Sequence, residues 1–335
     1  MGKHSADLKN LFSVSVVIPA CSMDRWDSLC KAVASVRAQT VPVLETVVVI
    51  DHHPGLMAKA ANELTGVTVI ANAGIRGVSG ARNTGAAASR GKVLAFLDDD
   101  AIASPNWLES LLQHFTDSEV VGAGGRPKPL WLTHRPQWFP QEFDWAVGCS
   151  YKGMPESATI VRNVWSNNMA IRRQAFDAVG GFRAGFGKIG AWSRPEDTDL
   201  CLRTATRDAG GTWIYDPNAT VGHQVPAERT TLSYFLKRCY YEGQGKATLA
   251  SLNGISESIS TERQYARYVL PRGIVRGLRE AGRGDVSGVA RSLAIIVGTS
   301  FAIAGFLADR AVGYAVARHR AGRRFGDDAA PMNRR

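Results

Sequence analysis

The chain has 335 residues, 45% of them hydrophobic, so it can form one large globular domain with an appendage and is not disordered. Its formal net charge is +10, and the last 75 residues carry most of it, with 14 arginines against six acidic residues. The five cysteines are scattered without a CxxC pair, which excludes a zinc ribbon or disulfide framework and indicates a reducing compartment. The short apolar stretch near the N-terminus is not long enough for a signal peptide, so we expect none.

Strands and helices alternate over the first hundred residues. Apolar runs predict strands at 13–20, 45–51, 67–72 and 92–100, and the intervening segments predict helices at 27–39, near 56–64 and at 80–90. Continuous Val and Ile runs are typical of strands covered on both faces, so we expect an α/β fold with a mostly parallel sheet. No glycine-rich dinucleotide motif or Walker loop is present. The Trp- and Pro-rich segment 126–165 is expected to be irregular.

Aspartates follow two of the predicted strands. Asp51 ends the second strand, and Asp98, Asp99 and Asp100 come directly after the fourth. An acidic run in isolation is often only a solvated turn. In a parallel sheet, however, ligands bind beyond the carboxyl ends of the strands. We therefore expect these carboxylates to line one crevice.

Six segments occur in a fixed order between residues 13 and 245: VSVVIPA, VVVID, GVSGARNTGAAASRGKVLAFLDDD, SNNMAIRRQAFDAVGGF, PEDTDLCLR and a final GH. As an ordered set they resemble the family-2 glycosyltransferases, which have the GT-A fold. Within that family the chain looks most like lipid-linked sugar transferases, including glucuronosyltransferases that extend a dolichyl-phosphate sugar. The resemblance implies a catalytic domain at 12–245, followed by a basic helical region at 246–335.

The resemblance also implies a nucleotide-sugar donor, UDP-linked, and a divalent cation that neutralises its diphosphate leaving group. Mg²⁺ and Mn²⁺ prefer carboxylate and phosphate oxygens. The Asp-x-Asp motif of the family fits Asp98-Asp99-Asp100, with Asp98 facing the ribose and the metal and Asp100 the metal. The triple run leaves the register open by one residue. His223 is implied as a further metal ligand, with a structural histidine as the alternative.

Further donor contacts are implied at the ends of the first two strands and in the following loop and helix. They are Pro19, Ala20, Asp51, Arg76 and Arg82, in addition to Asp98 and Asp99. Asp51 is expected to read the base, or else to cap its strand. His52 and His53 stand where the family often has another acid, so the base stays open. The arginines suit ribose or phosphate, with surface salt bridges as the alternative.

The PEDTDLCLR segment is predicted to begin a helix, whose N-terminus favours carboxylates. Helix capping is the alternative role for its acids. An inverting transferase needs a carboxylate that accepts the proton of the acceptor hydroxyl. The resemblance assigns that role to Asp197, with Glu196 orienting the acceptor. Asn167, Asn168 and Trp192 are expected to contact the acceptor sugar, although turn and packing roles are the alternatives.

The C-terminal region combines arginines with an uncharged run. Six arginines spaced three to five residues apart predict a basic helical face that Pro271 kinks or restarts; they are Arg263, Arg267, Arg272, Arg276, Arg279 and Arg283. Residues 292–308 contain no charge but are at the lower limit for a spanning helix. We expect an interfacial or re-entrant helix on an anionic membrane, with packing on the catalytic domain as the alternative. No nucleic-acid motif accompanies the charge, so no nucleic-acid partner is expected.

These features predict a metal-dependent inverting glycosyltransferase that acts on a lipid-linked or glycan acceptor. We expect it at the cytoplasmic face of the cell membrane, in cell-envelope or glycoconjugate synthesis. A nucleotidyltransferase-like enzyme is one alternative, although the loop after the first strand is not glycine-rich. A non-catalytic sugar-binding, membrane-associated protein is the other, against which the intact Asp98–Asp100 run and Asp197 argue.

Overall fold

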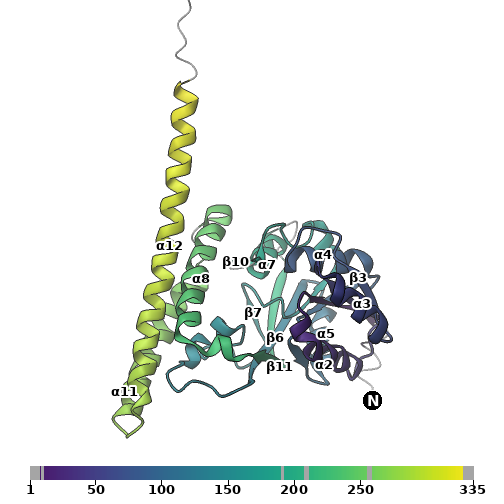
Figure 1. Cartoon of the computed structure of the whole chain (residues 1–335), viewed down its shortest axis with the longest axis horizontal. Coiled ribbons are helices and arrows are strands. Elements are labelled where there is room, and N and C mark those ends of the chain that lie inside the picture. Colours follow the sequence, from purple (N-terminus) through teal and green to yellow (C-terminus); the bar gives the residue numbers. More distant parts are fainter. Residues whose placement is uncertain (1–7, 9–10, 190–191, 207–210, 255–258, 327–335) are drawn as a thin grey trace, which may run out of the picture.

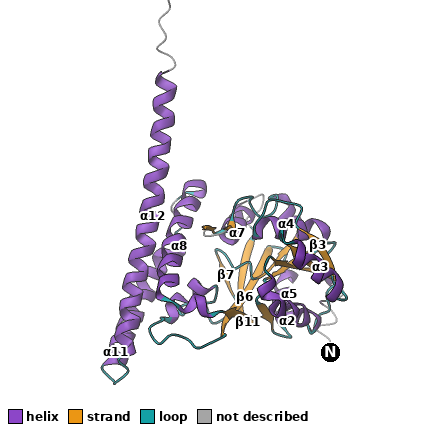
Figure 2. Cartoon of the chain, viewed as in Figure 1, coloured by secondary structure: helices purple, strands orange, loops and turns teal. Residues whose placement is uncertain are grey.

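The computed structural model describes residue 8 and residues 11–326 except 190–191, 207–210 and 255–258, and it describes no side chains at 188–193 and 312–326. Helices pack on both faces of a central sheet, and further helices stand to one side of it (Figures 1 and 2). The strands are β1 (Val14–Ala20), β2 (Glu45–Ile50), β3 (Thr68–Ala71), β4 (Val93–Leu97), β5 (Ala101–Ala103), β6 (Val120–Trp131), β7 (Thr159–Val161), β8 (Asn168–Arg172), β9 (Gly187–Ile189), β10 (Trp192–Arg194) and β11 (Thr212–Val225).

The α-helices alternate with these strands and then continue alone. They are α2 (Trp26–Arg37), α3 (Pro54–Glu63), α4 (Val78–Ala88), α5 (Trp107–Leu112), α6 (Arg173–Ala178), α7 (Glu196–Thr206), α8 (Leu232–Asn253), α10 (Ser260–Gln264), α11 (Leu270–Ala281) and α12 (Ser287–Gly326). Short 3₁₀ segments are η1 (Met23–Arg25), η2 (Gln113–Thr116), η3 (Gln141–Val147) and η4 (Ala227–Thr230), and η5 (Tyr265–Val269) is π-helical.

The strand order in the main sheet is β3-β2-β1-β4-β8-β6-β11-β5, and β7 pairs with β11. The four strands from β3 to β4 are parallel, and β6 and β11 are parallel to each other. Strand β8 runs antiparallel between β4 and β6, and β5 and β7 run antiparallel to β11. The predicted α/β class with a mostly parallel sheet is therefore confirmed.

Alternate residues of each central strand enter opposite apolar layers. In β1, Val16 and Ile18 belong to one core cluster, and Val17 belongs to the other. Helices α2 and α5 contribute to the first layer, and α4 and α6 contribute to the second. The uninterrupted apolar runs are thus buried on both faces, which places the polar ends of the strands at the edge of the sheet.

The segment 126–165 is more regular than predicted. Strand β6 extends to Trp131 although it contains Pro127 and Pro129. It pairs with β8 only at Gly122–Gly124 but with β11 as far as Trp131, so beyond Gly124 one edge of β6 has no strand partner. Proline is tolerated in a strand at such an edge because no N–H is required there.

A third apolar cluster joins the C-terminal helices to the segment that follows β6. It combines Phe139, Phe143 and Val147 with Phe235 of α8 and Ile295 of α12. The boundary predicted after residue 245 lies inside α8 and stays a prediction. Helix α11 begins at Leu270 directly after the π-helical turn, with Pro271 in its first turn, which fits the predicted restart at this proline. Residues 292–308 lie within α12.

Candidate active site

Carboxylates gather beyond the C-terminal ends of β2 and β4, as the parallel topology requires. Asp51 follows β2, and Asp98, Asp99 and Asp100 lie between β4 and the short strand β5. Strands β2 and β4 flank β1 on its two sides. Asp99 and Asp100 are buried, with 4% and 5% exposure. The sheet therefore concentrates negative charge at one edge.

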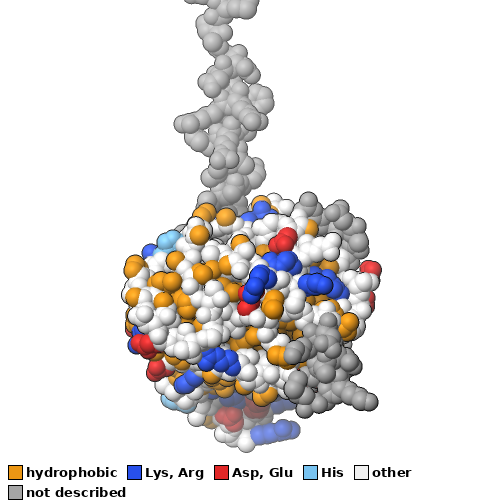
Figure 3. Space-filling view, turned by 90° about the vertical axis from the view of Figure 1, so that its right-hand side faces the viewer, with side chains coloured by type: hydrophobic (Ala, Val, Ile, Leu, Met, Phe, Trp, Pro, Cys, Tyr) orange, Lys and Arg blue, Asp and Glu red, His pale blue; other side chains and the backbone are white. Residues whose placement is uncertain are grey.

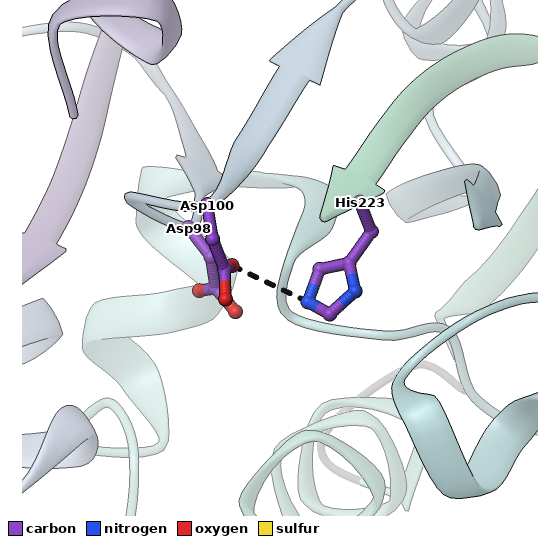
Figure 4. A group of neighbouring side chains, drawn as sticks. All are labelled: Asp98, Asp100 and His223. Atoms are coloured by element: carbon purple, nitrogen blue, oxygen red, sulfur yellow. Dashed lines mark ion pairs between the residues drawn. The ribbon is translucent and has the colours of Figure 1, made fainter. Parts of the chain in front are cut away.

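A metal-ligand group forms where the turn between β4 and β5 lies against β11. Ligand atoms of Asp98, Asp100 and His223 lie within 4.8 Å of one another. Figure 4 shows the imidazole of His223 turned toward the Asp100 carboxylate, with Nε2 3.3 Å from Oδ1. Antiparallel pairing of β5 with β11 sets this approach, because it places His223 opposite Ala101, the residue after Asp100. The structure thus brings together the three residues predicted as metal ligands.

The donor set of this group fits a divalent cation. Asp100 Oδ1 is buried without a hydrogen-bond partner although it faces an imidazole nitrogen. Two carboxylates and one imidazole are ligands that Mn²⁺ accepts, and Mg²⁺ favours the carboxylate oxygens. Gly148, at φ 81°, lies against the His223 ring, and a Cβ there would stand 3.0 Å from Cε1. Glycine at this position therefore gives the ring its space.

Two arginines that the sequence analysis did not single out approach the same acids. Arg25 Nη1 lies 2.8 Å from Asp99 Oδ1 and 3.0 Å from Asp100 Oδ2, and Arg229 Nη2 lies 3.6 Å from Asp100 Oδ2. Despite the opposing effect of burial, His223 and these arginines hold the pKa of Asp100 well below its usual range. Burial, with the neighbouring aspartates, raises the pKa of Asp99 to about 7. The site is therefore a balanced cluster of charges rather than a bare acidic turn.

Arg82 connects the metal-ligand group to the predicted acceptor side. Its guanidinium bonds Asp98 Oδ1 at 2.7 Å and Glu196 Oε1 at 2.9 Å. The Arg82 side chain is 2% exposed. Ser166 Oγ donates a further hydrogen bond to the same Glu196 oxygen. The structure thus pairs Arg82 with two carboxylates, and its contact with ribose or phosphate stays a prediction.

Asp197 lies at the start of α7, where the sequence predicts a helix N-terminus. Its Oδ1 accepts a hydrogen bond from the Thr198 N–H, so capping is one of its roles. Burial and the adjacent Glu196 raise the pKa of Asp197 to about 7, and Lys246 and Glu242 of α8 also act on it. A carboxylate with this pKa can accept a proton near neutral pH.

The predicted acceptor residues differ in their surroundings. Asn168 is fully buried: its amide oxygen accepts from Trp107 Nε1 at 2.7 Å, and its amide nitrogen donates to the Ala219 carbonyl. These contacts give Asn168 a packing role instead of the predicted contact with acceptor. Asn167 donates to the Gly148 carbonyl, but its Oδ1 is buried without a partner. Trp192 begins β10, and its side chain lies outside the described residues.

The remaining predicted donor residues surround the ends of β1 and β2. Ala20, which follows Pro19 at the end of β1, accepts a hydrogen bond from the Asp51 N–H. The Asp51 carboxylate accepts from Asn72 Nδ2 at 2.6 Å and from the Gly77 N–H at 2.9 Å. Asp51 therefore orders the loop between β3 and α4. Arg76 lies exposed in that loop.

The sequence analysis did not identify several other residues of the candidate site, because no local sequence pattern marks them. Arg25 could have been noticed as the first cation after the first strand, and Arg229 as the cation six residues after His223. Asn72, which holds Asp51, and Gly148, which accommodates His223, have no recognisable motif. Only the fold reveals their proximity.

Comparison with known proteins agrees with this geometry. Residues 15–180 match the model of "Glycosyl transferase family 2". The glucosyl-dolichyl phosphate glucuronosyltransferase of Haloferax volcanii is 33% identical over 241 residues, which cover 70% of this chain and 77% of the relative. The chain belongs to glycosyltransferase family 2. The transferase therefore moves a sugar from a nucleotide-sugar donor, which sets aside a nucleotidyltransferase and a non-catalytic binding protein.

Other relatives of the transferase are more distant. The succinoglycan biosynthesis protein ExoM of Rhizobium meliloti is 30% identical over 185 residues, which cover 54% of this chain and 56% of ExoM. A mannosyltransferase from Pyrobaculum calidifontis, solved with GDP-Man and Mn²⁺, superposes with a TM-score of 0.55 at 14% identity over 86% of both chains. GalNAc-T7, solved with UDP, GalNAc and Mn²⁺, gives 0.51 at 17% identity, over 74% of this chain and 54% of the other. These likenesses agree with the predicted GT-A fold.

Proposed function

We propose that this transferase is inverting, depends on Mg²⁺ or Mn²⁺, and extends a lipid-linked acceptor with sugar from a UDP-linked donor at the cytoplasmic face of a membrane. One observation carries the proposal. Arg82 joins Asp98 of the metal-ligand group to Glu196, which immediately precedes Asp197. A donor phosphate bound at the metal-ligand group and an acceptor hydroxyl bound at Asp197 would therefore meet in one crevice.

On the donor side, Asp98, Asp100 and His223 would hold the cation, which supplies positive charge to the diphosphate as it leaves. Arg25 and Arg229 surround Asp100 and keep it ionised. Their guanidinium groups are also suited to phosphate oxygens. Asp51 and the loop that it orders would receive the base and ribose, and Pro19 and Ala20, at the end of β1, would contact the donor beside them.

On the acceptor side, Asp197 would take the proton from the attacking hydroxyl. In-line attack on the anomeric carbon by this hydroxyl inverts its configuration, and no covalent glycosyl-enzyme is needed. Glu196 is held by Arg82 and Ser166, so its position is fixed. We propose that the second carboxylate oxygen of Glu196, together with Asn167, orients the acceptor sugar.

The lipid-linked acceptor is supported by the Haloferax volcanii relative, whose name describes a dolichyl phosphate-linked acceptor. Attachment to a membrane is supported by the chain itself. Among the described residues, Ser287–Ala311 of α12 is long and apolar enough to cross a membrane by length and composition. The adjoining α11 contributes exposed arginines. We therefore place the transferase at a membrane surface that holds its acceptor.

A panel of UDP- and GDP-sugars tests the donor and the metal together. Release of nucleoside diphosphate would be measured for each donor with Mn²⁺, with Mg²⁺ and with excess chelator. We expect one UDP-sugar to be turned over, and chelator to abolish the reaction. Undiminished turnover in chelator would overturn the metal proposal, and turnover of GDP-sugars alone would overturn the choice of base.

A further inference from the structure

Helix α12 presents to solvent a largely apolar face, in which Ser300 is an exposed polar residue. The six side chains of this apolar stripe lie along one side of the helix and are 39–60% exposed; they are Val289, Leu293, Ile296, Val297, Ile303 and Leu307. The stripe extends over 18 residue steps, or about 27 Å at 1.5 Å per residue. An exposed apolar surface of this length on a soluble protein indicates a partner.

The opposite face of α12 is packed tightly against α8. A Cβ at Gly243 would overlap the Ala302 carbonyl, and one at Gly305 would overlap the Tyr240 carbonyl, so the two backbones are in close contact. Farther along, Thr248 Oγ1 donates to Asp309 at 3.3 Å. Helix α8 therefore lies beside α12 over most of the apolar segment, as Figure 1 also shows.

Helix α8 is in turn fixed to the catalytic domain by charged side chains. Lys246 of α8 pairs with Glu262 of α10 at 2.7 Å, and Arg238 and Glu242 form a further ion pair at 3.1 Å within α8. Arg162, which follows β7 of the main sheet, holds the same Glu262 through two hydrogen bonds. If residues 287–311 crossed a bilayer, α8 and this ionic cluster would enter the hydrocarbon beside them. Charged groups at that depth are costly, so the packing opposes a spanning α12.

The surface next to the stripe matches an anionic leaflet. Arg272 and Arg279 of α11 and Arg283 just after it are exposed, as are the apolar side chains of Tyr268, in the preceding η5 turn, and Leu278. Basic and apolar side chains on one helix are typical of the headgroup layer. Figure 3 views the molecule from the side opposite α12, where basic and acidic groups are interspersed. A second copy of the chain fits less well, because it would bring a second arginine-rich region to the contact.

The apolar surface continues from the stripe onto α8. A groove of about 620 Å³ lies between the two helices, lined by Leu236, Tyr240, Tyr241 and Phe301 together with Lys237. Tyrosine and lysine are favoured at the boundary between headgroups and acyl chains. The groove would therefore lie at the boundary between headgroups and acyl chains. The apolar chain of a lipid could enter it there from the leaflet.

We infer that α12 lies in the plane of an anionic leaflet, with the stripe among the acyl chains and the α11 arginines at the phosphates, instead of crossing the bilayer. This inference rests on the membrane attachment proposed above. Helix α8 would then lie behind α12 at the usual helix packing distance of about 8–10 Å. The catalytic domain would stay on the same side as both ends of α12, close to the headgroups that carry the acceptor.

Sidedness tests the inference directly. Gly282→Cys and Arg310→Cys place thiols near the two ends of the apolar segment, in full-length protein with Cys21→Ser to remove the exposed native thiol. Membranes from expressing cells would be prepared as right-side-out and as inverted vesicles and treated with a membrane-impermeant maleimide. An in-plane helix predicts that both positions react in the same preparation. Reaction of one position in each preparation would overturn the inference while leaving membrane attachment intact.

Vesicle binding tests the stripe itself. Leu293→Asp and Leu307→Asp should each reduce partitioning onto phosphatidylglycerol-containing vesicles about tenfold, because each removes a buried leucine from the contact. Leu44→Asp is the matched control, since Leu44 is similarly exposed on the catalytic domain. If none of the three changes partitioning, or if wild-type protein does not bind, a lipid-covered stripe is excluded. Concentration-dependent dimerisation that the stripe variants abolish would instead assign the stripe to a second copy.

Discussion

Three acids and one histidine carry the chemistry proposed at the scale of single residues. Asp98, Asp100 and His223 converge within 4.8 Å, and Asp197 follows Glu196, which Arg82 ties to Asp98. Substitution of a metal ligand should weaken metal-dependent nucleotide binding, whereas substitution of Asp197 should reduce turnover. The changes can therefore be separated by measuring nucleotide binding and turnover independently.

Asp100→Ala should abolish the metal-dependent part of UDP binding. The variant loses the carboxylate that faces both His223 and Arg25, so the cation loses a ligand. Calorimetric titration of UDP with Mn²⁺ and with chelator would measure the effect, with the exposed Asp117→Ala as control. If Asp100→Ala keeps the full metal-dependent affinity, this residue is not a ligand.

Asp197→Asn should reduce turnover by roughly 10²–10⁴-fold and leave UDP affinity unchanged, because the amide keeps the size but cannot accept the proton. The pH profile gives a second readout. Since burial and Glu196 raise the pKa of Asp197 to about 7, the base is ionised above that pH and protonated below it. We therefore expect kcat/KM to be constant above about pH 8 and to fall with decreasing pH near 7. A flat profile from pH 5 to 8 would contradict the assignment.

Arg82→Met should destabilise the fold by about 3 kcal/mol, because Asp98 and Glu196 would face each other without their shared cation. Thermal unfolding at pH 7 would measure the loss. Arg82→Lys should recover only part of it, since one ammonium cannot reproduce both hydrogen bonds. Wild-type stability in Arg82→Met would show that the bridge is not structural.

Sequence patterns located most of these residues because strand ends and helix starts are local features. The Asp98–Asp100 run and the Glu196–Asp197 pair are visible as motifs. The partners are not, since Arg25 lies 74 residues before Asp99 and Arg82 lies 114 residues before Glu196. Asn168 belongs to a recognisable segment, yet its burial against Trp107 depends on packing that no motif reports.

At the scale of elements, the first half of the sheet was predictable and the second half was not. Strands β1, β2 and β4 are continuous apolar runs, and their parallel order follows from the intervening helices. Strand β5 has only three residues, and its antiparallel pairing with β11 brings together residues more than 100 positions apart. This pairing positions His223, so the metal-ligand group depends on the least predictable part of the sheet.

Close contact between α8 and α12 gives an element-scale prediction. Gly305→Val would force the Tyr240 backbone away and should cost about 1–3 kcal/mol of packing free energy. Hydrogen exchange should then increase in α8 near Tyr240. Ala304→Val is the control because Ala304 is exposed on the other face. Equal protection in both variants would show that the helices are not packed as described.

At the scale of the whole molecule, the charge distribution connects catalysis to location. The last 75 residues carry 14 arginines against six acids, while the catalytic region is nearly neutral. The helices of this region share an apolar core with residues 139–149, so they are not a flexible tail. The catalytic crevice would therefore be held at a fixed position relative to the surface that α11 and α12 contact.

Transfer of labelled sugar to lipid tests the central claim most directly. Full-length protein would be mixed with radiolabelled nucleotide sugar, Mn²⁺ and vesicles that contain a glycosylated polyprenyl phosphate, and label would be counted after organic extraction. We predict that label enters the organic phase with wild-type protein and Mn²⁺, and that it does not with chelator or with Asp197→Asn. Label found only as free sugar or on a water-soluble acceptor, with none in the lipid, would contradict the account.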